Sequence, residues 1–229
     1  MARPIQLPPS EAYERWAECY DADPNPLLAL EERCVGPLLH DVAGQTLIDV
    51  GCGTGRRLQT LVVAGASAVG VDLTQAMLSR ATAKPDAMGR CAQADALRLP
   101  FGDSAADIML GSLLVGYVNG LRALFAELAR VARPGGYILL SELHPEAVHS
   151  GWRRTFRAAG QLYEAEYTAH SIESVQEAAG STSALELVAM SEHCFEEPEQ
   201  AVFESAGKTN FDELRSSPAL WIGLWRVSA

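Results

Sequence analysis

The fold of this chain follows from the stretch Thr46-Leu47-Ile48-Asp49-Val50-Gly51-Cys52-Gly53-Thr54-Gly55. It is a short apolar run closed by three alternating glycines, and residues 56–64 after it have the pattern of a helix. Glycine is needed where the backbone takes a positive φ or where a ligand must approach the main chain closely. The following helix offers free N–H groups and the positive end of its dipole, which suit a carboxylate or a phosphate. The stretch therefore predicts a buried strand, a glycine turn that contacts a ligand, and a helix.

The same alternation of strand and helix patterns continues along the chain. Helical patterns at 74–83 and 121–132 alternate with short apolar runs. Those runs predict six further strands, at 68–72, 89–95, 106–110, 137–142, 185–194 and 219–227. Strands that alternate with helices at this spacing imply βαβ units. We therefore expect an α/β fold with a doubly wound, mostly parallel seven-stranded sheet and helices on both faces.

Two regions depart from this pattern. Residues 10–20 read as an amphipathic helix with Ser10 as its N-cap, and a second helix over 27–39 should be interrupted at Gly36-Pro37. These helices predict an N-terminal lid. Residues 151–167 alternate aromatic and charged side chains and predict a hairpin, inserted after the fifth strand.

A length of 229 residues favours a single domain. Within it we expect a lid over 1–42, a cofactor-binding core over 43–146, and a substrate-side insertion with the terminal strands over 147–229.

Composition narrows the function classes. The formal net charge is -11 and no basic stripe occurs, which argues against a nucleic-acid partner. The apolar run at 61–71 is too short for a transmembrane segment, and residues 1–10 lack the apolar region of a secretory signal. Five cysteines at wide spacings fit neither a disulfide framework nor a zinc site. We expect a cytoplasmic protein without a metal, a monomer or a homodimer.

The glycine turn leaves two ligand classes open. A dinucleotide fingerprint reads G-x-G-x-x-G/A, and its last small residue packs the helix on the strand. Gly51 and Gly53 fit this pattern, but Arg56 stands at the position of the last small residue. This large side chain argues against a dinucleotide, although a nicotinamide-dependent oxidoreductase stays as an alternative.

Residues 48–55 resemble the first motif of the class I S-adenosylmethionine-dependent methyltransferases, and most closely the branch of the ubiquinone and menaquinone biosynthesis methyltransferases. The match extends in order over roughly residues 43–146. The resemblance implies a Rossmann-like fold and S-adenosylmethionine as cofactor. It also implies that the cofactor contacts the turn residues Gly51, Cys52, Gly53 and Gly55.

Two later strand ends extend the implied cofactor site. Asp72 follows the first glycine by about 20 residues, a spacing at which a carboxylate can accept hydrogen bonds from the ribose hydroxyls. Leu73 beside it could pack on the adenine. The resemblance implies that Asp95 and Ala96 form hydrogen bonds with the edge of the adenine. Simple alternatives remain: Asp72 as an acid at a helix N-terminus and Asp95 as a loop residue.

Other residues are implied at the methionine end of the cofactor. By resemblance, Asp49 orients the loop and the ligand's ammonium group, and backbone carbonyls of Gly111 and Ser112 could hold the same group. Tyr20 matches a tyrosine of the family's N-terminal lid. For Asp49 a buried structural hydrogen bond is the alternative, and for Tyr20 it is core packing.

Methyl transfer is a direct in-line displacement, so the protein mainly has to position the acceptor atom. A general base is needed only where the acceptor must lose a proton. His144, which follows the fifth strand, is our first candidate base, and Tyr117 is the second. A structural role for His144 is the alternative. Further candidates after the fifth strand are Glu142, His149 and His170.

The acceptor is expected to contact residues 1–30 and 147–180. This second region holds aromatic side chains that could form a wall, namely Trp152, Phe156, Tyr163 and Tyr167. It also holds a basic cluster, Arg153, Arg154 and Arg157. The cluster either binds an acceptor carboxylate or phosphate or pairs with Glu164 and Glu166 across the hairpin.

The prediction is therefore a methyltransferase that acts on a small molecule, with no nucleic-acid or membrane partner. A protein that binds S-adenosylmethionine without transferring its methyl group is the other alternative.

Overall fold

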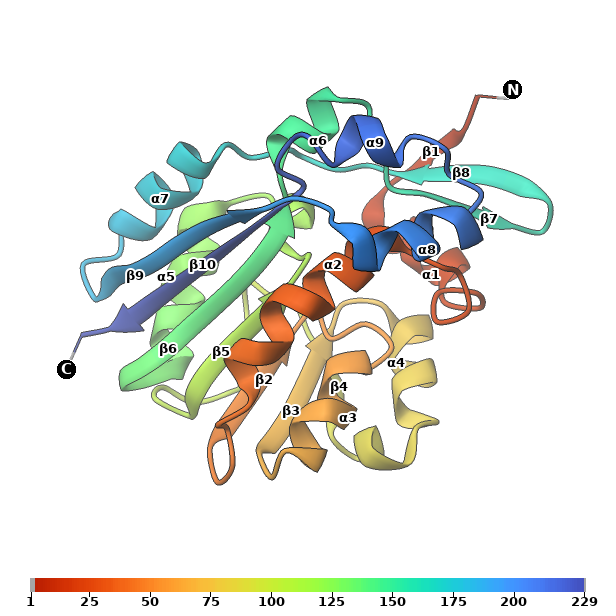
Figure 1. Cartoon of the computed structure of the whole chain (residues 1–229). Helices are drawn as coiled ribbons and strands as arrows, with labels where there is room; N and C mark the ends of the chain where they lie inside the picture. Colours follow the sequence, from red (N-terminus) through yellow and green to blue (C-terminus); the bar gives the residue numbers. More distant parts are fainter. Residues whose placement is uncertain (1–2, 229) are drawn as a thin grey trace.

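A seven-stranded sheet forms the centre of the computed structural model, which describes residues 3–228 (Figure 1). Its strand order is β4-β3-β2-β5-β6-β10-β9. The strands are β2 (Thr46–Val50), β3 (Ser67–Asp72), β4 (Cys91–Gln93), β5 (Ala106–Ser112), β6 (Ala132–Leu143), β9 (Leu185–His193) and β10 (Leu220–Val227). The first five run parallel, and β10 is antiparallel to both β6 and β9. The predicted mostly parallel, seven-stranded sheet is confirmed.

The chain winds outward from β2 in two directions. β3 and β4 follow on one side of β2, whereas β5 and β6 follow on the other. The loops after β2 and β5 therefore diverge at the carboxyl end of the sheet, which is where doubly wound sheets form a ligand crevice.

Helices cover both faces of the sheet, as predicted. One face packs against α2 (Pro26–Val35), α3 (Arg56–Val63) and α8 (Glu197–Ser205), and the other packs against α5 (Leu121–Val131) and α7 (Ile172–Gly180) (Figure 1). In α5 the buried residues recur at helical spacing, as Leu124, Phe125, Leu128 and Val131. The remaining helical segments are α1 (Pro9–Trp16), η1 (Gly36–Leu39), α4 (Gln75–Thr82), η2 (Pro85–Ala87), η3 (Val115–Tyr117), α6 (Pro145–His149) and α9 (Phe211–Leu214).

A second, three-stranded sheet lies beside the carboxyl end of the first (Figure 1). The predicted hairpin forms from β7 (Thr155–Ala158) and β8 (Gln161–Ala165), joined by two residues that both have positive φ. A strand that we did not predict, β1 (Ile5–Leu7), adds to β8 in parallel. Trp16 of α1 stacks on Phe156 of β7 with ring centroids 4.7 Å apart, so the N-terminal segment and the hairpin form one unit.

Several predicted boundaries are wrong. Ser10 does not cap α1, because the helix already begins at Pro9, where a proline costs no hydrogen bond. The second helix begins at Pro26, since the side chain of Asn25 accepts from the N–H groups of Leu27 (3.0 Å) and Leu28 (3.4 Å). It changes to a 3-10 helix at Gly36, as the Gly-Pro pair predicts.

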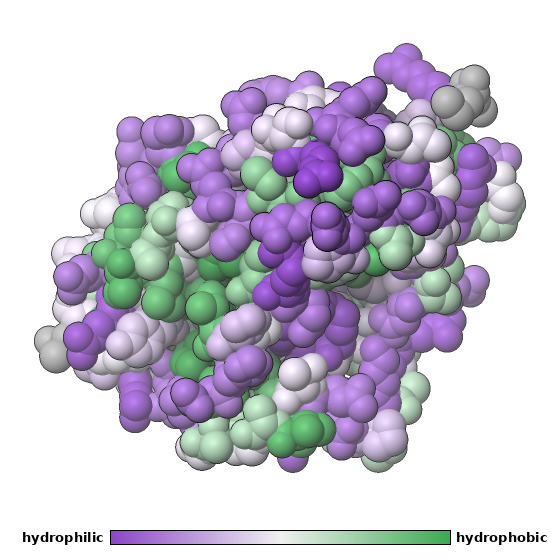
Figure 2. Space-filling view, in the orientation of Figure 1, coloured by the Kyte–Doolittle hydropathy of each residue, from purple (hydrophilic) through white to green (hydrophobic). Residues whose placement is uncertain are grey.

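Figure 2 shows polar side chains over most of one face of the molecule. Apolar side chains gather there over β6, β9 and β10, beside α2. Leu187 and Val188 of β9 are exposed. Within residues 3–228, no helix combines the length and the apolar character needed to cross a bilayer.

Candidate functional site: a cavity at the carboxyl end of the sheet

A cavity of about 330 Å³ lies at the carboxyl ends of β2, β3 and β5. The N-terminal segment and the loop before β7 contribute to its walls. The structure brings most of the predicted cofactor residues together there. Those that line the cavity are Tyr20, Asp49, Gly51, Cys52, Gly53, Asp72, Leu73, Asp95, Ala96 and Ser112.

The glycine turn has the backbone conformation that the sequence predicts. Gly51 and Gly53 have φ values of 73° and 56°, where other residues would be strained. The N–H groups of Gly51 and Cys52 donate to the carbonyl of Val71, at 2.8 and 3.0 Å, and hold the turn against β3. No atom lies within 4 Å of the place of a Cβ on Gly53. The main chain is therefore open to a ligand at Gly53.

Asp72 both supports the turn and faces the cavity. Its two carboxylate oxygens accept from the N–H groups of Gly53 (2.9 Å) and Thr74 (2.8 Å). Burial raises the pKa of Asp72, and these backbone donors oppose that rise. A carboxylate oxygen has more than one lone pair, so each can accept a further hydrogen bond. The helix-terminal role and the ligand role predicted for Asp72 are thus compatible.

The edge of the cavity beyond Asp72 combines an exposed apolar side chain with a polar turn. Leu73 is 55% exposed although it is a large hydrophobic residue. Asp95 accepts from the N–H of Leu97 at 2.9 Å, and Ala96 lies beside it in the wall. An aromatic base placed here would cover Leu73 and meet polar groups at its edge.

Asp49 is the most deeply buried acid of the cavity wall, at 2% exposure. Burial raises its pKa to about 7, against the opposing effect of Arg57 and Arg56. A cationic ligand group beside Asp49 would stabilise the ionised carboxylate.

Gly55 and Gly111 have packing roles and are absent from the cavity wall that the described residues form. Gly55 has a φ of 72° and precedes α3, and a Cβ on it would lie 3.1 Å from the Cβ of Ala81 in α4. A Cβ on Gly111 would lie 2.7 Å from a methyl group of Leu140 in β6. The sequence pattern could not separate these close approaches within the protein from an approach by a ligand.

His144, predicted as a catalytic base, does not reach the cavity. It occupies the N-cap of α6, where Nδ1 accepts from the N–H of Glu146 at 3.1 Å. Its Nε2 lies 3.2 Å from a carboxylate oxygen of Glu192 in β9. Burial lowers the pKa of His144, partly offset by Glu192. The side chain therefore connects α6 with β9, which is the structural alternative to a catalytic base.

The basic cluster divides into two parts. Arg153 lies 3.7 Å from Glu164, as the hairpin pairing predicts. Arg154 instead is buried in the cavity wall, and its Nε donates to the hydroxyl of Tyr117 at 2.7 Å. Its Nη2 donates to the hydroxyl of Tyr13 at 2.9 Å. Sequence reasoning missed Tyr13, which lies 141 positions from Arg154.

The aromatic wall of the cavity consists of Tyr13, Tyr20 and Tyr117. The aromatic residues predicted for this wall pack elsewhere: Trp152 stacks on Phe195, and Phe156 stacks on Trp16.

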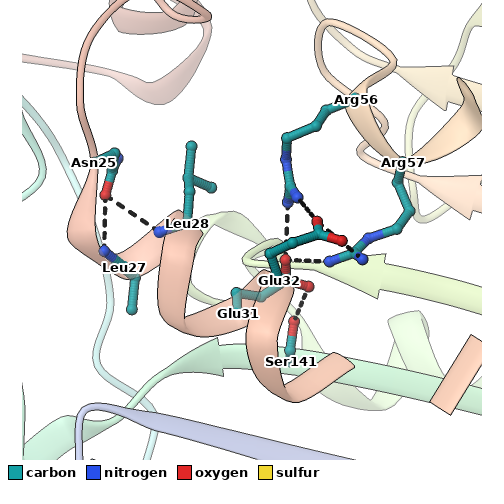
Figure 3. Close-up of polar contacts among 8 residues, drawn as sticks. All are labelled: Asn25, Leu27, Leu28, Glu31, Glu32, Arg56, Arg57 and Ser141. Carbon is teal, nitrogen blue, oxygen red and sulfur yellow. Dashed lines mark hydrogen bonds and ion pairs between the residues drawn. The ribbon is translucent and has the colours of Figure 1, made fainter. Parts of the chain in front are cut away.

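Buried ion pairs join α2 to α3, the helix after the glycine turn (Figure 3). Glu31 of α2 is fully buried and pairs with Arg56 (2.8 Å) and Arg57 of α3. It also accepts from the hydroxyl of Ser141 in β6 at 3.2 Å. Burial raises the pKa of Glu31, but the two guanidinium groups outweigh that effect and the pKa is lowered. The network fixes α2 beside the cavity.

Comparisons with known proteins agree with this geometry. Residues 48–140 match the family model of a methyltransferase domain. The chain is 36% identical over 138 residues to malonyl-[acyl-carrier protein] O-methyltransferase of Serratia marcescens, over 58% of this chain and 52% of that protein. It is 30% identical over 142 residues to demethylmenaquinone methyltransferase of Tropheryma whipplei (strain Twist), over 58% of each chain. The chain thus spans little more than half the length of these curated relatives.

A solved structure, an S-adenosylmethionine-dependent methyltransferase from Mesorhizobium loti, shares the fold with a TM-score of 0.68. The two chains are 22% identical, and the superposition covers 88% of this chain and 100% of the other.

The sheet order and the cavity beside the glycine turn define a Rossmann-like α/β protein. Residues 48–140 match a methyltransferase domain and the curated relatives are methyltransferases, in agreement with the resemblance to the class I S-adenosylmethionine-dependent methyltransferases that the sequence shows. The dinucleotide alternative loses its support, because the glycine turn lies inside the matched methyltransferase domain.

Proposed function

We propose that this protein binds S-adenosylmethionine in the cavity at the carboxyl end of the sheet and transfers its methyl group to a small molecule. One observation carries the proposal: the open glycine turn, Asp72 and the pair Asp95–Ala96 all line one cavity. Its volume of about 330 Å³ lies within the range of small-molecule sites, roughly 300–1,000 Å³.

Residues of the cavity wall match each part of the cofactor. The glycine turn and the N-terminus of α3 would bind the carboxylate of the methionine part. Asp72 would accept from the ribose hydroxyls, while Leu73, Asp95 and Ala96 would bind the adenine. Asp49 would face the ammonium group together with the backbone carbonyl of Ser112, and Tyr20 would cover the methionine end.

The acceptor would enter between the methionine end and the side chains of Tyr13, Tyr117 and Arg154. S-adenosylmethionine supplies a methyl group already activated by its sulfonium, so the protein's task is to align the acceptor and exclude water. Burial raises the pKa of Tyr117, partly offset by Arg154. Tyr117 therefore keeps its proton at neutral pH and acts as a hydrogen-bond donor.

Calorimetric titration with S-adenosylhomocysteine tests the cofactor site. We expect binding to the wild type and a loss of about tenfold or more in affinity for Asp72→Ala, because a charged hydrogen-bond acceptor is removed. Asp95→Ala should also weaken binding. Asp212→Ala is the matched control, since Asp212 is an exposed acid on α9.

A folded wild type that does not bind S-adenosylhomocysteine would overturn the proposal. Equal affinities of Asp72→Ala and Asp212→Ala would overturn the placement of the ribose.

Incubation of a metabolite extract with isotope-labelled S-adenosylmethionine separates transfer from binding alone. A transferase produces a labelled product one methylene unit heavier than its acceptor. Binding without any labelled product would instead support a protein that uses the cofactor without transferring its methyl group.

A further inference from the structure

The cations of the cavity wall differ in their partners. Among the described residues that line the cavity, Arg56, Arg57 and Arg154 carry a positive charge. Arg56 and Arg57 both pair with Glu31 and Glu32. Arg154 has no such pair within residues 3–228. Arg154 thus differs from Arg56 and Arg57, because no carboxylate among the described residues forms an ion pair with it.

Arg154 is also held rigidly at a buried position. It is 4% exposed, and its Nε and Nη2 donate to the hydroxyls of Tyr117 and Tyr13. Its guanidinium lies over the rings of Trp16 and Tyr117, at 5.9 and 5.6 Å from their centroids. Nη1 is buried without a hydrogen-bond partner in the described part of the chain. A buried donor and charge of this kind are costly unless a ligand satisfies them.

Glu142 is the carboxylate in electrostatic range of Arg154, and its oxygens are already engaged. One accepts from the N–H of Gly116 at 2.9 Å and the other from the N–H of Leu143 at 2.7 Å. Burial raises the pKa of Glu142, whereas Arg154 lowers it. Glu142 is also not part of the cavity wall formed by the described residues. It therefore leaves Nη1 of Arg154, which has no partner among the described residues, available to a ligand.

The two phenols extend this donor set. Tyr13 and Tyr117 accept hydrogen bonds from Arg154 and are also hydrogen-bonded to each other, so one of the two hydroxyl hydrogens remains free to donate to another acceptor. Both residues line the cavity. A ligand there would meet one guanidinium and one free O–H donor of the tyrosine pair, with Arg154 2.7 and 2.9 Å from the two hydroxyls.

We propose that Arg154, Tyr13 and Tyr117 bind a carboxylate of the methyl acceptor, so that the substrate of the proposed methyltransferase is a small carboxylic acid. The inference rests on the proposed function, since it concerns the acceptor end of the same cavity. A single cation with a neutral O–H donor beside it matches one negative charge. The carboxyl groups of the cavity wall, namely Asp49, Asp72 and Asp95, form no ion pair among the described residues, which disfavours a dianionic phosphate.

Matched acid and amide probes test the assignment. Protein saturated with S-adenosylhomocysteine is titrated with a panel of aromatic pairs, such as 4-hydroxybenzoate with 4-hydroxybenzamide, and with phenyl phosphate. The wild type should bind at least one acid about tenfold or more tightly than its amide, because a charge-assisted hydrogen bond is lost in the amide. Arg154→Gln should abolish this preference, and Arg154→Lys should restore part of it.

Arg153→Gln is the matched control, because Arg153 is the exposed neighbour that pairs with Glu164. It should keep the full preference for the acid. The affinity of each variant for S-adenosylhomocysteine, measured in parallel, shows that the cofactor end is still folded.

The outcomes separate the two proposals. A wild type that does not bind S-adenosylhomocysteine contradicts the proposed function itself. Binding of S-adenosylhomocysteine with no acid bound more tightly than its amide overturns the carboxylate site alone, as does an unchanged preference in Arg154→Gln. Tighter binding of phenyl phosphate than of every acid would replace the carboxylate by a phosphate ester.

Discussion

Burial changes the pKa of the Asp49 carboxyl group in this protein. Asp49 lies in the middle of an apolar strand, and burial raises its pKa from 3.8 to about 7. The unfolded chain exposes the same side chain to water, where its pKa is ordinary. The folded protein therefore binds the Asp49 proton more tightly than the unfolded chain does.

This difference predicts a pH-dependent stability. Between about pH 4 and pH 7 the folded state holds the proton that the unfolded state has lost, so this contribution to stability falls as the pH rises. Asp49→Asn stays neutral throughout and lacks that fall. The free energy of unfolding of Asp49→Asn, relative to the wild type, should therefore increase by a few kcal/mol from pH 4 to pH 8, because each tenfold change in proton affinity is worth roughly 1.4 kcal/mol.

Urea unfolding of both proteins without ligand at a series of pH values measures this difference. Parallel profiles for wild type and Asp49→Asn would show that Asp49 has an ordinary pKa in the folded protein.

At the scale of elements, helix α2 is joined to α3, the helix after the glycine turn, by ion pairs as well as by apolar packing. Glu31 on α2 and Arg57 on α3 are both buried, and the glycine turn immediately precedes α3 (Figure 3). A buried pair stabilises little in net terms, because both charges lose their hydration. Removing one partner is costly, because it leaves the other buried and unpaired.

We therefore expect Glu31→Gln to destabilise the protein by about 3–5 kcal/mol. Glu32→Gln is the matched control on the next residue, where the carboxylate is 46% exposed and the expected loss is at most about 1 kcal/mol. Urea denaturation at neutral pH measures both. Similar losses in the free energy of unfolding for Glu31→Gln and Glu32→Gln would show that removing the buried carboxylate costs no more than removing the exposed one.

At the scale of the whole molecule, the cavity lies between two sheets. The seven-stranded sheet supplies the glycine turn and its carboxylates, whereas Tyr13 comes from α1 and Arg154 from the loop that enters the small sheet at β7. A ligand that contacts both parts binds the folded state alone, and it stabilises that state by mass action.

Thermal unfolding should therefore shift with S-adenosylhomocysteine. At a ligand concentration of about 100 times Kd the gain is about 2.7 kcal/mol, which raises the Tm of a chain of this size by about 5–10 °C. NADH at the same concentration should leave the Tm unchanged. A larger shift with NADH would restore the oxidoreductase alternative.

Local patterns were sufficient to predict the large sheet and many of the residues that line the cavity. The order of β2, the glycine turn and α3 depends on backbone conformations that neighbouring residues decide. The ends of parallel strands meet at one edge of the sheet, so Asp72 and Asp95 could be placed near the turn from their positions in the chain. The three-residue strand β1 is too short to give a pattern of its own.

The acceptor end needed the tertiary structure. Arg154 and Arg153 are neighbours of the same type, yet one is buried against Tyr117 and Tyr13 and the other is exposed beside Glu164. His144 follows β6, but its side chain caps α6 and lies away from the cavity.

The order of residues along the chain was enough to predict the fold class, the resemblance to methyltransferases and the residues that line the cavity at the glycine turn. Those features depend on residues close together in the chain and on the regular geometry of parallel strands. Which side chains face the acceptor became evident from the folded chain alone. That arrangement depends on contacts between segments more than a hundred positions apart, for which local spacing carries no signal.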